Sequence, residues 1–185
     1  MLLNEKIKTD GGIRNIHFDF TEWTHRIDEN DYSLLTLKYW LISNSTHVID
    51  TVFFLAGTPK NLYSLNDKKR KLSWHPSASV FVGCGSTTKD ILFSYNSNWT
   101  SSGRWKIEVV TDLGKYILAP MEELKFIERG TINEIQVENL AYNYDNEFKP
   151  GIYLQTNSFL ESKKSLCTLD EQIINMPHYS NIANY

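Results

Sequence analysis

The sequence predicts an α+β fold in which an open antiparallel β-sheet has its helices packed on one face. From Val80 to Leu140, short stretches of alternating apolar and polar residues follow one another with tight turns between them, as in antiparallel sheets. A strongly apolar helical stretch precedes these strands, and two helical patterns follow them. No strand runs into a GxGxxG loop and a helix, and no β–α–β repeat occurs, so a doubly wound parallel sheet is excluded.

Composition narrows the class of protein. With 185 residues, of which 41% are hydrophobic and 13% aromatic, residues 1–185 are expected to form a single domain around one core. The net charge of −3 argues against binding to nucleic acid or to an anionic membrane surface. No apolar run approaches the roughly 20 residues of a membrane span, and the opening MLLNEKIKTDGG lacks the apolar core of a signal peptide. The only two cysteines, Cys84 and Cys167, make neither a disulfide framework nor a metal site. These features predict a cytoplasmic protein with reduced thiols.

The first element after a short polar lead and a Gly11–Gly12 break is a predicted strand. Its apolar and polar positions alternate with a period of two: Ile16, Phe18 and Phe20 on one face, His17 and Asp19 on the other. His17 is therefore expected on the outer surface. Residues 21–37 have no steady period and predict a loop or a short irregular helix.

The most apolar stretch, residues 39–57, predicts a helix that begins at Ser45 or Thr46 as N-cap and ends at Gly57. His47 and Asp50 are three residues apart and share one face of this helix. Two interpretations stay open. His47 is either a hydrogen-bonded, inert residue of a capped core helix, or a general acid/base at a helix mouth, since the pKa of histidine lies near working pH.

The following strands are predicted at 61–65, 80–82, 90–99, 104–111, 115–119, 124–129 and 134–140. Asn66–Lys71 is expected to be a solvated loop, Gly83–Gly85 a glycine-rich turn, and Asp112–Gly114 a tight hairpin turn. Successive strands joined by such turns predict an antiparallel meander.

Two helices are predicted at the end of the chain. Pro150 suits the first turn of a helix over 152–161. Thr168 and Glu171 form a capping box at the start of a second helix, which Pro177 is expected to bend or end.

Three segments together resemble the C-terminal domain of the Gfo/Idh/MocA family of nicotinamide-dependent sugar and polyol oxidoreductases. NSTHVIDTVFFLAGTPK is similar to the family's helix with the catalytic histidine and a Leu-x-Gly end. SSGRWKIEVVTDLGKYILAPMEEL is similar to the sheet of one branch, and FKPGIYLQTNSFL to the family's K-P-G helix. The order and spacing of these motifs, from Phe18 to Ile182, make the resemblance specific.

The resemblance implies a two-domain enzyme in which a Rossmann domain binds NAD(P) and the antiparallel-sheet domain shapes a pocket for a sugar or polyol. His47 corresponds to the family's acid/base histidine. The family commonly has an aspartate four residues earlier, where this chain has Ser43, and a serine cannot stabilise an imidazolium as a carboxylate does. The family's Glu-Lys-Pro motif belongs to the Rossmann half and is not in this chain.

We therefore expect His47 to be catalytic and five residues to contact the substrate: Ser43, Asn44, Asp50, Arg104 and Lys149. Arg104 and Lys149 are candidates for binding a carboxylate or phosphate of the substrate. The chain by itself is expected to bind no cofactor.

Two hypotheses about the whole protein stay open. The chain is either the substrate-binding and oligomerisation domain of an NAD(P)-dependent sugar oxidoreductase, excised or encoded apart from its Rossmann domain, or a free-standing module of that origin that binds sugar or dimerises without catalysis. The opening MLLNEK is similar to the middle of a helix that links two domains, which favours a longer ancestor.

A homodimer or higher oligomer joined through the sheet face is also expected. Apolar residues lie on both alternations of the strands, with Leu92 opposite Ile91 and Val110 opposite Val109, whereas an uncovered sheet face is normally polar. Pairing two such faces about a two-fold axis would cover them. A charge at Ile107 or Val109 would then break the dimer, provided that these side chains lie on the outer face.

Overall fold

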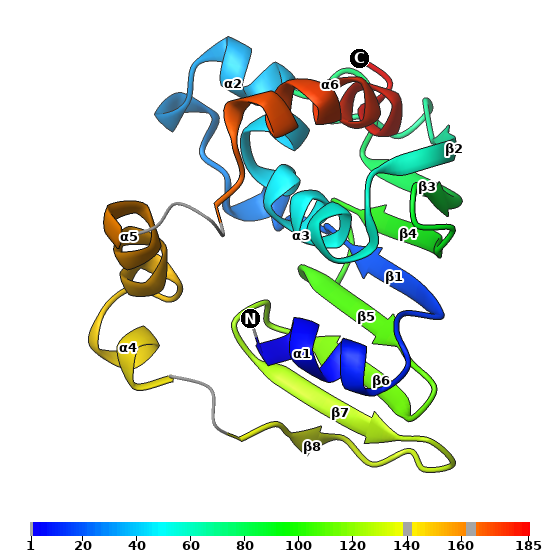
Figure 1. Cartoon of the computed structure of the whole chain (residues 1–185). Coiled ribbons are helices and arrows are strands. Elements are labelled where there is room, and N and C mark those ends of the chain that lie inside the picture. The colour runs from blue at the N-terminus through cyan, green and yellow to red at the C-terminus, as the bar shows by residue number, and fades with distance from the viewer. Residues whose placement is uncertain (1, 139–141, 162–165) are drawn as a thin grey trace.

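The computed structural model describes residues 2–138, 142–161 and 166–185, and it confirms an α+β fold with an open, mostly antiparallel sheet. Eight strands are arranged in the order β2-β3-β4-β1-β5-β6-β7-β8 (Figure 1). The strands are β1 (Asn15–Asp19), β2 (Pro59–Asn66), β3 (Val80–Thr87), β4 (Leu92–Asn98), β5 (Lys106–Val110), β6 (Gly114–Leu118), β7 (Leu124–Glu128) and β8 (Ile135–Gln136).

Strand β1 departs from the predicted meander because it pairs in parallel with β4 and antiparallel with β5. Its inward residues Ile16 and Phe18 are fully buried, so this apolar strand takes the middle of the sheet rather than an edge. The arrangement brings the carboxyl ends of β1 and β4 and the amino end of β5 to the same side of the sheet, where these strands begin or end.

The predicted turn at Gly83–Gly85 is wrong, since β3 runs straight through both glycines. Aromatic rings of the neighbouring strand explain why glycine is needed there. A Cβ at Gly83 would collide with the ring of Tyr95, and a Cβ at Gly85 with the ring of Phe93 and the backbone of Asn61. These glycines make room for core aromatics and do not form a turn.

Helices pack on one face of the sheet, as predicted. They are α1 (Leu2–Thr9), α2 (Leu34–Lys38), α3 (Thr46–Ala56), α4 (Tyr142–Glu147), α5 (Ile152–Glu161) and α6 (Leu169–Ala183). Helices α1, α3 and α6 lie close against the strands, whereas α4 and α5 stand apart on the same side (Figure 1). The polar lead is thus mostly helical, and residues 21–37 hold two short 3₁₀ turns, Thr24–Arg26 and Glu29–Asp31, before α2.

Helix α3 begins differently from the prediction. A π-helical turn, Leu41–Ser45, runs directly into it, and the Thr46 backbone N–H donates to the Leu41 carbonyl. Because that turn already supplies acceptors, Ser45 does not cap the helix through its side chain, and His47 does not stand at an open helix mouth. Gly57, with a φ of 89°, ends the helix as predicted.

Helix α6 begins with the predicted capping box of Thr168 and Glu171. Pro177 lies inside the helix, so of the two predicted outcomes, a bend or an end, the end is excluded. The turns after the proline are held by packing, because Tyr179, Ile182 and Ala183 are fully buried. Tertiary contacts thus outweigh the hydrogen bond that proline removes.

The two sheet faces differ in burial. Ile107 and Val109 lie on the helix-covered face and are 0% and 1% exposed. The prediction that a charge at either position breaks the dimer required them to lie on the outer face, and this condition is not met. On the opposite face Tyr63 is 70% and Leu92 63% exposed. The predicted strand 134–140 is short in the structure, and its last two residues lie outside the described ranges. No helix within the described ranges is long and apolar enough to cross a membrane.

Candidate functional site

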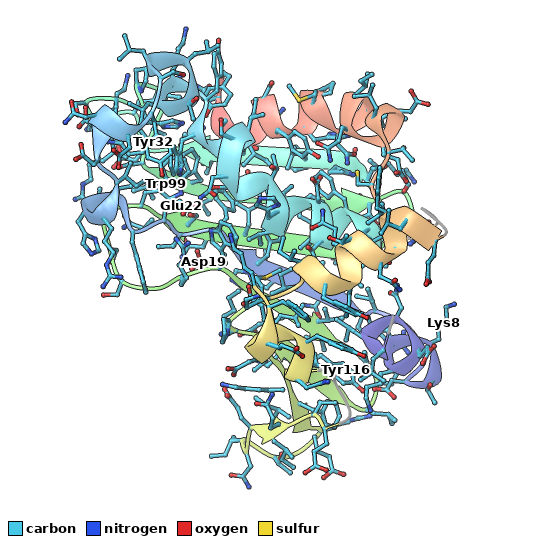
Figure 2. All side chains as sticks on the ribbon, turned by 90° about the vertical axis from the view of Figure 1, so that its left-hand side faces the viewer. Lys8, Asp19, Glu22, Tyr32, Trp99 and Tyr116 are labelled. Carbon is cyan, nitrogen blue, oxygen red and sulfur yellow. The ribbon has the colours of Figure 1, made fainter. Side chains whose placement is uncertain are left out.

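The candidate site is built around Glu22, which follows β1 at the sheet edge where three strands meet. Glu22 continues the parity of Ile16, Phe18 and Phe20, so its side chain turns inward and is 2% exposed. Figure 2 places Glu22 near the end of the molecule that holds Trp99 and Tyr32, away from Tyr116 and Lys8.

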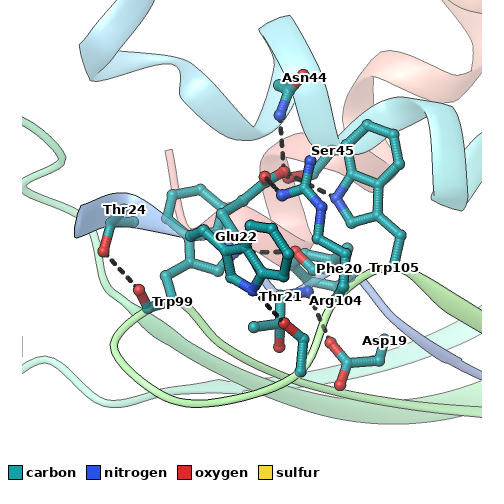
Figure 3. Close-up of polar contacts among 12 residues, drawn as sticks. Asp19, Phe20, Thr21, Glu22, Thr24, Asn44, Ser45, Trp99, Arg104 and Trp105 are labelled. Carbon is teal, nitrogen blue, oxygen red and sulfur yellow. Dashed lines mark hydrogen bonds and ion pairs between the residues drawn. The ribbon is translucent and has the colours of Figure 1, made fainter. Parts of the chain in front are cut away.

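Four donors surround the Glu22 carboxylate (Figure 3). Oε1 accepts from Asn44 Nδ2 at 2.9 Å, Ser45 Oγ at 2.9 Å and Trp105 Nε1 at 3.0 Å. Oε2 accepts from Arg104 Nη1 at 2.8 Å. The carboxylate therefore joins the end of β1, the π-helical turn before α3 and the start of β5.

Burial raises the pKa of Glu22, and the hydrogen bonds from Ser45, Trp105 and Arg104, with the charge of Arg104, act in the opposite direction. The Arg104 guanidinium also lies over two indole rings, 4.8 Å from the Trp105 centroid and 5.3 Å from the Trp23 centroid. Cation–π contacts and the ion pair together hold Arg104 in place.

The loop that carries Glu22 is held by its own hydrogen bonds. Trp23 Nε1 donates to the Gly103 carbonyl at 2.7 Å, and Thr24 Oγ1 donates to the Trp99 carbonyl at 2.6 Å. The Trp99 indole donates in turn to the Phe20 carbonyl at 3.1 Å. This irregular segment is thereby fixed against the loop that leads from β4 to β5.

A cavity of about 350 Å³ opens beside this network. Its lining residues are Glu22, Trp23, Arg26, Ile27, Tyr32, Thr36, Trp40, Ser43, Asn44 and Arg104. The volume is at the lower end of the range for small-molecule sites. Three of the predicted substrate contacts, Ser43, Asn44 and Arg104, meet here. The Ser43 hydroxyl donates to the Tyr39 carbonyl at 3.2 Å.

His47 lies next to this cavity but not in its wall. Its side chain is exposed, and its ring is 5.9 Å from the Trp105 ring, centroid to centroid; Trp105 in turn donates to Glu22. His47 follows Ser43 by four residues, across the junction of the π-helical turn and α3. His47 is therefore not a core residue, and the choice between an inert histidine and an acid/base is still open.

The other two predicted contacts lie elsewhere. The Asp50 carboxylate accepts hydrogen bonds from three side chains of α6: Gln172, Asn175 and Tyr179. Lys149 is exposed in the turn between α4 and α5. Neither residue lines the cavity, so the structure does not bring them together with Ser43, Asn44 and Arg104.

Sequence reasoning did not select Glu22, Trp23, Arg26, Trp40 and Trp105, nor the other lining residues Ile27, Tyr32 and Thr36. For Glu22 a signal was available, because the alternation of β1 extends to it and places a carboxylate on the buried face. A buried carboxylate needs partners, and this would have directed attention to nearby donors. Trp105 shares the inward face of the predicted strand 104–111 with Ile107 and Val109, which predicts burial but names no polar partner. Trp23 and Arg26 lie in the stretch without a steady period, where the sequence carries no such signal.

Two other hollows lie around the end of α6, with volumes of about 480 and 380 Å³. Both are lined by Lys68, Asn184 and Tyr185, and neither contains a buried charged group. The volume of a cavity alone therefore does not identify the site. A metal site does not identify it either, because no group of three or more His, Cys, Asp or Glu in the described ranges is placed to hold a metal ion.

The described residues do not fit a dinucleotide cofactor. Binding of its pyrophosphate requires a glycine loop that opens onto a helix N-terminus. Here Gly83 and Gly85 lie inside β3 and face aromatic rings, whereas Gly11 and Gly12 precede a strand.

Comparison with solved structures gives the fold class. A dehydrogenase from Clostridium difficile aligns with 99% of this chain at a TM-score of 0.69 and 16% identity. An oxidoreductase from Agrobacterium radiobacter, solved with NAD⁺, L-tartaric acid and magnesium, aligns with 98% at a TM-score of 0.63 and 11% identity. An inositol dehydrogenase homolog from Azotobacter vinelandii, solved with NADH and myo-inositol, aligns with 76% at a TM-score of 0.54 and 17% identity.

These structures are Gfo/Idh/MocA-type oxidoreductases, and the chain has the fold of their C-terminal domain. It spans 58%, 56% and 40% of the three chains, respectively. The fold that the sequence resemblance implied is thus confirmed. No family model and no curated protein matches the sequence.

Proposed function

We propose that this chain is the substrate-binding and oligomerisation half of an NAD(P)-dependent oxidoreductase that acts on a sugar or polyol. The observation that carries the proposal is the cavity beside His47, where Ser43, Asn44 and Arg104 converge on a wall fixed by Glu22. The likeness to oxidoreductases of about twice this length supports it.

In this proposal the chain binds the sugar ring in the cavity and moves one proton. NAD(P), held by a separate or covalently linked Rossmann domain, supplies the redox chemistry. Asn44 and Arg104 orient hydroxyl groups of the ring. The hydroxyl that becomes a carbonyl projects out of the cavity toward His47, which takes its proton. Ser43 brings no negative charge to the imidazolium that forms, and the Glu22 carboxylate is connected to His47 through Trp105 instead.

The coding sequence upstream of Met1 tests the organisation at once, since the proposal expects a Rossmann domain in frame or in an adjacent gene. Turnover by the assembled enzyme tests His47. His47→Asn and His47→Ala should lower the rate about 10²–10⁴-fold and leave the fold intact by circular dichroism. His17→Asn, on the outer face where His17 contacts Ser94, is the matched control. More than about a tenth of the activity in the His47 variants would favour an inert His47.

Cofactor binding by the chain alone is a separate test. Calorimetry with NAD(P)H or NAD(P)⁺ should show no binding, because the described residues offer no pyrophosphate site. A dissociation constant of tens of micromolar or tighter would contradict this part of the proposal.

The exposed apolar residues on the open sheet face are also consistent with a second candidate function, a dimerising module without catalysis. Tyr63, Leu65 and Leu92 are 70%, 76% and 63% exposed there. Both candidates predict a dimer with twice the 21.5 kDa mass of one chain by light scattering. Leu92→Asp should give monomers, whereas Leu34→Asp, at an 85% exposed site on the helical side, should not. A monomeric wild-type protein at micromolar concentration would refute the dimer.

A further inference from the structure

The balance of charge in the cavity wall is positive. Arg26 and Arg104 are cationic, and Glu22 is the one carboxylate among the lining residues. Glu22 is already engaged, since its two oxygens accept four hydrogen bonds and it forms the ion pair with Arg104. The charge of Glu22 is therefore offset by Arg104, and the charge of Arg26 is left over.

Arg26 is held at the mouth of the cavity without an acidic partner among the described residues. Its guanidinium lies 4.8 Å from the centroid of the Trp23 ring, whose other neighbour is Arg104. The nearest acids in sequence are engaged elsewhere: Asp28 accepts from the Asn30 backbone and side chain, and Glu29 accepts from Ser73. Arg26 is exposed, and its N–H groups are available to a ligand.

A second donor in the wall is also unused. Trp40 is 6% exposed, lines the cavity, and its Nε1 is buried without a hydrogen-bond partner in the described part of the chain. A buried donor without a partner destabilises the folded protein, and an acceptor on a bound ligand would relieve that cost. The wall thus holds unused donors and a surplus positive charge.

We propose that the cavity binds an acidic sugar, one whose ring carries a carboxylate or phosphate group, with Arg26 as the residue that contacts the anionic group. This proposal rests on the proposed function and specifies its substrate class. An arginine positioned on an aromatic ring presents its planar edge to an oxyanion, and Trp40 Nε1 donates to a further oxygen of the ligand.

Calorimetric titration of the chain with acidic sugars and their neutral parents tests the proposal. The probes are D-glucuronate, D-galacturonate and D-glucose 6-phosphate, compared with D-glucose and D-galactose, at about 50 and 500 mM salt. At least one acid should bind tenfold or more tightly than its parent, and high salt should weaken it because the partner of the anion is exposed. Binding of the uronates alone identifies a carboxylate site, and binding of the phosphate alone a phosphate site.

Arg26→Gln should weaken binding of that acid about 10- to 100-fold, as expected for a hydrogen bond to a charged group. The matched control Arg129→Gln alters an exposed arginine outside the cavity and should change nothing. Thermal melts of both variants establish that they fold. The proposal is overturned if the neutral parents bind as well as the acids, if no acid binds, or if Arg26→Gln binds like the wild type.

Failure here is distinguishable from failure of the proposed function. If neutral sugars are turned over by the assembled enzyme in a His47-dependent way, the acidic-sugar inference is wrong and the oxidoreductase proposal stands. If acids bind through Arg26 but the His47 variants keep full turnover, the binding inference stands and the proposed role of His47 is wrong.

Discussion

Two carboxylates near helix α3 are each ringed by donors, but only one lies at a cavity. Glu22 accepts from Asn44, Ser45, Trp105 and Arg104 beside a space of about 350 Å³. Asp50, on α3 itself, accepts from Gln172, Asn175 and Tyr179 of helix α6, and none of these four residues lines a cavity described above.

This difference indicates that the Asp50 cluster is structural, whereas the Glu22 cluster belongs to a binding site. At Asp50 every donor comes from one helix, so the cluster fastens α6 to α3. Burial raises the pKa of Tyr179, and the neighbouring Asp50 raises it further, which keeps this phenol a donor. At Glu22 the donors come from several segments, and unused donors, those of Arg26 and Trp40, remain in the adjoining wall. A ring of donors shows that a carboxylate is buried, whereas donors without partners indicate a ligand.

Removing the side chain of Glu22 should have the largest effect. Glu22→Ala leaves all four donors without their acceptor and leaves Arg104 without its carboxylate. Breaking a buried pair costs roughly 3–5 kcal/mol, and because Arg104 is 43% exposed we expect the lower end, about 3 kcal/mol. Urea denaturation measures this loss of unfolding free energy, and the acidic-sugar titration should show loss of binding.

Glu108→Ala is the matched control for Glu22→Ala. Glu108 pairs with Lys106 and Lys115 on the open sheet face, and such pairs contribute about 0–1 kcal/mol. If Glu22→Ala proves as stable as Glu108→Ala, the Glu22 network does not hold the site together.

Asp50 should give the next largest effect, on stability alone. Asp50→Ala leaves the buried Tyr179 hydroxyl and the Asn175 side chain without their acceptor, at a cost of about 2 kcal/mol. Urea denaturation should show this loss, and the affinity for acidic sugars should not change. A weakened affinity would instead support the sequence-based prediction that Asp50 contacts the substrate.

Local patterns account for the parts of the fold that the sequence predicted. The alternation of β4 and β5, the turn at Asp112–Gly114, the stop at Gly57 and the capping box of α6 all follow from residues within a few positions of one another. The errors concern contacts between distant segments. Parallel pairing of β1 with β4, the glycines under Phe93 and Tyr95, and the uninterrupted helix at Pro177 depend on tertiary packing.

The candidate site divides in the same way. Ser43, Asn44 and His47 were predicted because they lie together in one apolar stretch, and Arg104 because of the motif that contains it. Glu22 contacts Arg104 although the two are 82 residues apart in sequence, and no local pattern predicts a contact between residues so far apart. Asp50 shares a helix face with His47 by spacing, yet its partners are set by how α6 packs.

A smaller effect is expected from a single donor of the Glu22 network. Ser45→Ala removes one of four hydrogen bonds to the carboxylate, in a fully buried position, and should cost about 1 kcal/mol by urea denaturation. Thr51→Ala, which removes an exposed side-chain bond to the His47 carbonyl, is the control and should stay within about 0.5 kcal/mol of the wild type. Equal losses in the two variants would indicate a general effect on α3.

The smallest expected effect is on how the unfolding free energy varies with pH. Burial raises the pKa of Glu22 above its ordinary value of 4.5, so between 4.5 and the raised value the folded protein holds more of this proton than the unfolded chain. The unfolding free energy changes with pH in proportion to the number of protons bound by the unfolded chain minus the number bound by the folded protein. For Glu22 this difference is negative, so the unfolding free energy falls as pH rises. The contribution of Glu22 is therefore complete below the unfolded pKa and is lost as pH rises through the folded pKa. Unfolding free energies of wild type and Glu22→Gln, measured in parallel, should diverge in favour of the wild type as pH falls through this window. A difference that stays constant, or that shrinks as pH falls, would mean that the four donors outweigh burial and that Glu22 holds its charge as readily as it would in water.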